Sequence, residues 1–242
     1  MVDHTRRTVL SAVGTGVALS ATGAVGGAAE EEQEDAARVV HFSPDAPTLD
    51  IHVENEVWFE SVEALTFEEH YMPSEPGTYD VAAVPAGESR EAALVEAECV
   101  VEPGPCTLAV VGEVCAVTDA HLDLIALKDD FEPTEQNHAR VRMMHASPDA
   151  PMIDVRTENG TTIAEGISFG ETATVEVPAD ETVLVVSEAE GETIARFPLD
   201  PEAGHVYSAF GAGYLDVKNA PEDAEENSFS LAVMEDASPG ER

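Results

Sequence analysis

A histidine, a serine and an aspartate occur close together at two places in the chain, and these are the residue types of a hydrolytic triad. The two sets lie 104 residues apart, at His41, Ser43 and Asp45 and again at His145, Ser147 and Asp149. In a triad the histidine takes the serine proton while the carboxylate orients the histidine. Pro44 and Pro47 force turns here, and the chain has no Gly-x-Ser-x-Gly elbow. We therefore predict turn chemistry, in which the Ser or Asp side chain caps backbone N–H groups and the histidine bonds across the loop.

Two pairs of carboxylates flank these turns and suggest a calcium site as an alternative. They are Asp45 with Asp50, and Asp149 with Asp154. Ca²⁺ takes six to eight oxygen ligands, and the chain has no Asp-x-Asp-x-Asp-Gly loop. The eight histidines and three cysteines have no zinc spacing either. The expectation is a solvated acidic surface, with no bound metal and no cofactor.

Cysteines and one glycosylation sequon are the sites of possible covalent modification. Cys99 and Cys106 flank a Pro-Gly turn, so the alternatives are a disulfide between them, with Cys115 left free, and free buried thiols. Asn159-Gly160-Thr161 is the only sequon. Asn-Gly is also the strongest short hairpin signal, so both a glycan at Asn159 and an unmodified turn stay open.

An internal repeat organises the chain. The segment Arg38–Asp50 recurs as Arg142–Asp154, with the Arg, the His and the whole Ser-Pro-Asp-Ala-Pro run identical. The rest aligns loosely, for example Met72-Pro73 with Val177-Pro178. A period this long indicates two domains in series and not a solenoid. The expected organisation is a signal at 1–29, an acidic linker at 30–36, repeat one at 37–132, a linker at 133–138, repeat two at 139–238 and a tail at 239–242.

Short strands dominate each copy. Segments such as Asp50–Val53 and Thr174–Val177 alternate apolar and polar residues with period two. Such runs recur every 8 to 12 residues between Pro, Gly and acidic turns, which is typical of sandwiches and barrels. Residues 88–98 fit either a helix or a hairpin arm. The predicted fold class is all-β, with two tandem antiparallel β-sandwich domains of immunoglobulin-like architecture.

The charge balance excludes some partners and suggests a habitat. The chain has 49 acidic and 11 basic residues and a formal net charge of -38. Such a surface repels nucleic acids and anionic membranes. Acidic residues run along the whole chain, and only Lys128 and Lys218 are lysines. This pattern indicates a halophilic, haloarchaeal source, since high salt screens the self-repulsion.

The N-terminus has the pattern of a twin-arginine export signal. Arg6-Arg7 precede a weakly apolar stretch of small residues, and an acidic run follows. The stretch is interrupted by glycines and is shorter than the ~20 apolar residues of a membrane span. The expected location of the mature chain is therefore outside the cell or at the cell surface, without a transmembrane segment.

The repeated segment resembles a known family. The pattern Arg-x-x-His-x-Ser-Pro-Asp-Ala-Pro-x-x-Asp is similar to that of the domain of unknown function family 4397 (DUF4397). The resemblance covers residues 37–130 and 139–236 as two tandem copies. It implies a β-sandwich and an extracellular or envelope location, and it implies no established activity.

The sequence therefore predicts a non-enzymatic secreted or cell-surface module for adhesion, envelope assembly or contact with an unknown protein or glycan. The alternative is a secreted ligand- or metal-binding protein, or a hydrolase that uses the repeated His, Ser and Asp. The environments of His41 and His145 discriminate between the two.

Overall fold

The chain divides into two compact units, residues 1–31 and 32–242. A computed structural model describes residues 34–68, 70–115, 118–129, 134, 137–179, 182–189, 191–221 and 227–237, all in the second unit. The export signal and most of the expected linker lie outside the described residues. Among these residues no helix is long and apolar enough to cross a membrane.

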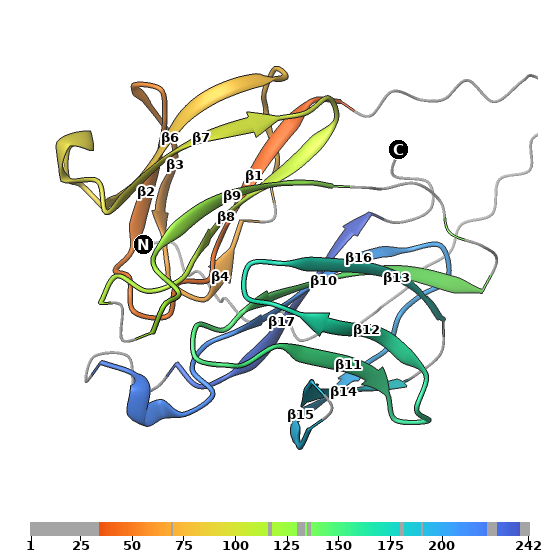
Figure 1. The fold of residues 1–242 in the computed structure, drawn as a ribbon. Helices are drawn as coiled ribbons and strands as arrows, with labels where there is room; N and C mark the ends of the chain where they lie inside the picture. Colours follow the sequence, from red (N-terminus) through yellow and green to blue (C-terminus); the bar gives the residue numbers. More distant parts are fainter. Residues whose placement is uncertain are drawn as a thin grey trace, which may run out of the picture. The chain divides into compact units, whose positions relative to one another are not determined.

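The first half of the described chain forms two sheets (Figure 1). One has the order β4-β1-β8-β9, with β5 paired to β1, and the other has the order β3-β2-β6-β7. Their bounds are β1 Ala36–His41, β2 Leu49–Val53, β3 Glu56–Val62, β4 Thr66–Phe67, β5 Met72–Pro73, β6 Gly77–Pro85, β7 Val95–Val101, β8 Pro105–Val111 and β9 Asp123–Lys128. Residues 88–98 contain a short 3-10 turn, η1 (Arg90–Ala92), and the start of β7, so this segment is a hairpin arm.

The second half repeats this strand order. Its sheets are β13-β10-β16-β17 and β12-β11-β14-β15. Their bounds are β10 His138–Ala146, β11 Ile153–Thr157, β12 Thr162–Ile167, β13 Thr172–Pro178, β14 Thr182–Glu188, β15 Thr193–Leu199, β16 Val206–Ala212 and β17 Ser230–Ala237, with a 3-10 turn η2 at Val217–Asn219. The expected all-β sandwich architecture is confirmed, and Asn159-Gly160 forms the turn between β11 and β12.

The sheets are not antiparallel throughout. Within the described residues, β1 pairs in parallel with β8, and β10 pairs in parallel with β16, while the other ladders between strands are antiparallel. The chain visits the other sheet between the two partners of each parallel pair, as such pairs need a long connection. Local periodicity carries no information on this pairing.

The ladders also correct the looser parts of the repeat alignment. Ala37 lies opposite Met72 in the first half, and Val141 lies opposite Val175 in the second. Because Ala37 and Val141 are equivalent, Met72 corresponds to Val175 and not to Val177. The strand bounds also shift the expected linkers, since Ala36 already belongs to β1 and His138 to β10.

Strand β1 is buried on both faces, because successive side chains point to opposite sides of a sheet. Val39 packs into the core between the two sheets of the first half. Val40 and Phe42 point the other way, into a cluster that includes Met144 and Phe210 of the second half. We call this contact between the halves the seam. Each half thus has its own core, and a third apolar layer joins them.

Candidate functional site

The repeated histidines are buried and face backbone carbonyls. His41 Nε2 lies 3.1 Å from the Pro47 oxygen, and His145 Nε2 lies 3.0 Å from the Pro151 oxygen. Both side chains are 0% exposed. Burial lowers the pKa of His41 to about 4, against the smaller opposing effect of the Pro47 carbonyl, and lowers the pKa of His145 as well. Both imidazoles are therefore neutral at neutral pH and close the loop that follows the strand.

The serine and first aspartate of the motif clamp a distant loop. Ser43 Oγ donates to Asp45 Oδ1 at 3.3 Å. The Asp45 carboxylate accepts from the backbone N–H groups of Val114 and Cys115, at 2.9 and 2.8 Å. These residues follow β8, so the motif pins the end of the parallel partner of β1. This is the capping arrangement that the turn interpretation predicts.

The second copy makes the same clamp. Asp149 accepts from the backbone N–H groups of Leu215 and Asp216, at 2.6 and 2.9 Å, and from Asn219 Nδ2 at 3.0 Å. Ser147 Oγ donates to the Gly213 carbonyl at 2.6 Å. A proton path from serine to histidine is not formed in either copy, because each hydroxyl donates elsewhere and each Nε2 contacts a carbonyl.

The second aspartates of the motif hold the neighbouring hairpin turns. Asp50 accepts from the backbone N–H groups of Ser61 and Gly87, at 2.7 and 2.8 Å. Asp154 accepts from Gly166 N–H at 2.8 Å. Backbone groups thus occupy the oxygens that the calcium hypothesis needs. Among the described residues, no three His, Cys, Asp or Glu side chains form a group that could hold a metal ion.

The cysteines are free thiols, and the sequon lies on an exposed turn. Cys99 and Cys106 are both buried while Cys115 is exposed, so of the two alternatives the structure contains the free thiols. Burial raises the pKa of Cys99 to about 11 and that of Cys106 to about 12. Asn159 is exposed, and its Oδ1 accepts from Thr161 N and Oγ1 at 3.2 and 3.0 Å.

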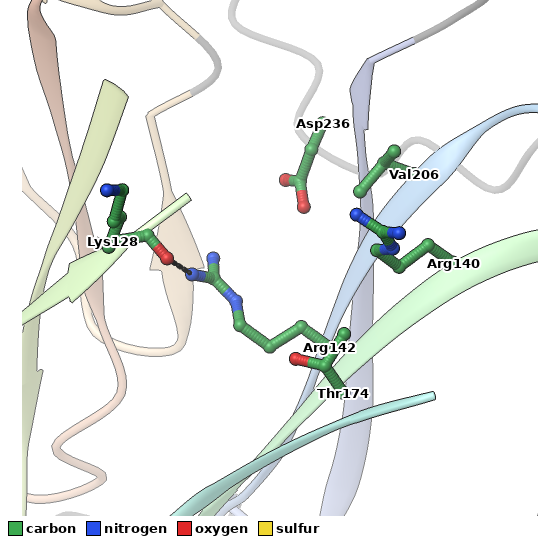
Figure 2. A pocket seen from close by; sticks show the side chains of 6 residues that line it. All are labelled: Lys128, Arg140, Arg142, Thr174, Val206 and Asp236. Atoms are coloured by element: carbon green, nitrogen blue, oxygen red, sulfur yellow. Dashed lines mark hydrogen bonds between the residues drawn. The ribbon is translucent and has the colours of Figure 1, made fainter. Parts of the chain in front are cut away.

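The seam places polar groups together that the sequence did not connect. Its apolar part includes Phe42 and Phe210, whose ring centroids lie 4.6 Å apart. Beside the polar part, a hollow of about 30 Å³ opens between the halves. Figure 2 shows its lining residues, which are Lys128, Arg140, Arg142, Thr174, Val206 and Asp236.

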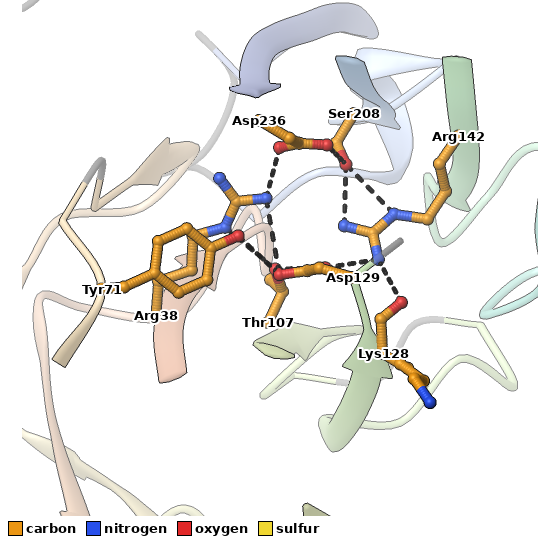
Figure 3. Close-up of polar contacts among 8 residues, drawn as sticks. All are labelled: Arg38, Tyr71, Thr107, Lys128, Asp129, Arg142, Ser208 and Asp236. Atoms are coloured by element: carbon orange, nitrogen blue, oxygen red, sulfur yellow. Dashed lines mark hydrogen bonds and ion pairs between the residues drawn. The ribbon is translucent and has the colours of Figure 1, made fainter. Parts of the chain in front are cut away.

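Two arginines and two aspartates cross the seam reciprocally (Figure 3). Arg38 Nη2 of the first half lies 2.5 Å from Asp236 Oδ1 of the second. Arg142 Nη1 of the second half lies 2.6 Å from Asp129 Oδ1 of the first. Arg38 and Arg142 are equivalent in the repeat, and so are the two aspartates at the ends of β9 and β17. Such reciprocal contacts are those of an isologous interface, here made within one chain.

A hydroxyl in each half links its arginine to its own aspartate. Thr107 Oγ1 accepts from Arg38 Nε at 2.9 Å and donates to Asp129 Oδ2 at 2.8 Å. Ser208 Oγ accepts from Arg142 Nη2 at 2.7 Å and donates to Asp236 Oδ2 at 2.6 Å (Figure 3). Each carboxylate therefore receives donors from both halves. Buried ion pairs are tolerated when their remaining hydrogen bonds are satisfied in this way.

The network is buried although charged residues normally stay at the surface. Side-chain exposure is 2% for Arg38, 0% for Asp129 and 3% for Asp236. The arginines lie on the seam face of their strands, two residues before Val40 and Met144. Period two therefore held a signal for them, because Arg38 and Arg142 begin both motifs on the face of β1 and β10 that is turned away from each half's own core.

Comparison with known proteins identifies the family. Residues 36–156 match the family described as domain of unknown function (DUF4397), which is half of the chain. The chain belongs to the DUF4397 family. The match ends at Arg156 in β11, so it covers the first half and the repeated motif of the second.

Beyond the DUF4397 match, no curated protein matches the chain. Among solved structures, the Bacillus anthracis TIE protein is similar over 84% of this chain and 44% of its own, at 9% identity and a TM-score of 0.25. The chain thus spans less than half the length of that protein, and likeness at this level carries no argument about this protein.

Proposed function

We propose that the protein is a non-enzymatic module exported to the cell surface of a halophile, where it contacts an envelope protein or glycan. One observation carries this proposal: in both copies the residues suited to catalysis are used to hold the fold. The histidines face carbonyls in the interior, and the aspartates cap backbone N–H groups. A substrate cannot reach a side chain with no exposed area.

The second half is, on this proposal, a second DUF4397 domain. Its strand order, its clamp at Asp149 and its buried His145 all match the first half. The two domains are paired through the seam and therefore present their remaining surfaces as one rigid body. A rigid pair lowers the entropy cost of binding an extended envelope partner with both domains at once.

Export and envelope binding are tested together in the producing organism. Cells that express the full chain are separated into cytoplasm, envelope and medium, and the chain is located with an antibody. We expect envelope-associated protein, and retention in the cytoplasm when Arg6→Lys and Arg7→Lys are combined. The purified chain, added in molar salt to envelopes from cells that lack it, is expected to sediment with them.

The enzyme alternative is tested on the same preparation. Ester, peptide and glycoside substrates are offered to the intact chain and to the Ser43→Ala, Ser147→Ala double variant. We expect the same background rate from both. Turnover that disappears in the variant, or a chain that neither leaves the cytoplasm nor binds envelopes, would overturn the proposal.

A further inference from the structure

The hollow beside Arg142 has an equivalent place in the first half, and there it is filled. The Tyr71 ring covers Arg38, with the guanidinium carbon 4.7 Å from the ring centroid, and its hydroxyl donates to Asp129 at 2.6 Å. Met72 corresponds to Val175 by strand register. The next residue, Tyr71, therefore corresponds to Thr174. The shorter threonine leaves open beside Arg142 the space that a tyrosine ring fills beside Arg38.

Two further differences between the halves add positive charge at the open place. Arg140 lines the hollow, and its equivalent in β1 is Ala36, since Ala36 pairs with Pro105 as Arg140 pairs with Val206. Lys128 also lines it, and its equivalent in β17 is Glu235. All three differences point the same way, toward more room and more positive charge.

This concentration is unusual for so acidic a chain. The described residues contain eight arginines and lysines. Half of them lie at the polar part of the seam: Arg38, Lys128, Arg140 and Arg142. The acidic partners at the outer edge are distant and partly exposed, with 3.4 Å from Lys128 to Glu102 and 3.4 Å from Arg140 to Glu176. Exposed pairs of this kind neutralise charge weakly.

We propose that the hollow beside Arg142 binds a small monovalent anion, with chloride as the natural occupant. Its volume of about 30 Å³ is the space of one water molecule in the liquid, which a halide ion nearly matches. Arg142, Arg140 and Lys128 supply the positive charge, and Asp236 is the only carboxylate in the lining. Thr174 is exposed, so the hollow has an entrance from solvent. The anion would help to neutralise arginines held at the seam.

The protein's own first half supplies the test variants. Thr174→Tyr fills the hollow with the residue found at the equivalent place, and Arg140→Ala removes the charge that the first half lacks. Thermal unfolding is measured while chloride replaces fluoride at constant ionic strength. We expect the melting temperature of the intact chain to rise by about 3 °C and that of each variant to rise by much less. General salt effects act on all three proteins alike.

Diffraction from crystals grown in bromide locates the anion directly. We expect an anomalous peak in the hollow of the intact chain and none there in Thr174→Tyr. Acetate in place of bromide distinguishes a carboxylate site, which would protect the intact chain better than chloride does. Absence of the peak overturns the proposal. A peak with the same chloride response in all three proteins would mean an adventitious ion only, and a preference for acetate would replace chloride as the ligand.

Discussion

Replacing Arg38 by methionine tests the crossed ion pairs at their most buried point. The change keeps the length and much of the volume of the side chain but removes the cation 2.5 Å from Asp236. Asp236 would then keep only the Ser208 hydroxyl, at 2.6 Å, among the printed partners of its carboxylate in the described chain. Removing one partner of a buried pair costs about 3–5 kcal/mol, because the remaining charge is left without compensation.

The equivalent change in the other half is the matched control. Arg142→Met removes the cation beside Asp129, but that carboxylate still accepts from Tyr71 at 2.6 Å and from Thr107 at 2.8 Å. Hydrogen bonds to a charged group contribute about 1.5–3 kcal/mol each. We therefore expect Arg142→Met to cost less than Arg38→Met, by roughly one such bond.

The pH dependence of the Arg38→Met defect has a definite sign. Burial raises the pKa of Asp236 above 3.8, and Arg38 opposes this rise, so its loss raises the pKa further. The folded variant then binds a proton at a pH where the unfolded chain has released it. Stability relative to the intact protein therefore increases as the pH falls through the folded pKa. The defect should shrink on acidification.

Equilibrium urea unfolding in molar KCl measures these effects. Trp58 is the single tryptophan and reports on the first half, while circular dichroism reports on both. Adding Asp236→Asn to Arg38→Met removes the unpaired charge and should recover at least ~2 kcal/mol. The reasoning is refuted if Arg38→Met costs under about 1 kcal/mol, or if the double variant is no more stable than the single one.

Three further changes test the local geometry. Gly112→Ala would place a Cβ 2.2 Å from the His121 carbonyl at φ +89°, whereas Gly87→Ala at φ +83° meets nothing within 4 Å; calorimetry should show a loss near 1–2 kcal/mol for Gly87→Ala and a clearly larger one for Gly112→Ala. His41 has a pKa of about 4 when folded against 6.5 for the free group, so the unfolded chain binds more protons between these values and stability falls as the pH drops from 6.5 to 4; His41→Gln should have a shallower slope in urea titrations across this range. Cys115 should react with a thiol reagent in the native protein, and the two buried thiols only after unfolding; fast reaction of more than one thiol would contradict their burial.

Several features of this protein are determined by residues close together in the sequence. The repeat is visible because thirteen consecutive positions match at one offset. The Ser-Pro-Asp-Ala-Pro turn follows from proline's fixed φ and from the short Asp side chain, which can reach nearby backbone N–H groups. Period-two alternation predicts strands wherever one face is buried. These signals are local, and the strands and turns that they predict are present.

The seam and its charge network were decided only by the tertiary structure. Arg38 and Asp236 are 198 residues apart, and no local pattern states which outer face of one half will cover the other. Composition even argues against the result, because a chain rich in carboxylates can pair its few arginines anywhere on the surface. The hollow depends on register in both halves at once, since it exists only because Thr174 lies where Tyr71 lies in the other copy. Packing between faces is a property of the whole fold, and it places the polar centre of this protein between its two repeats.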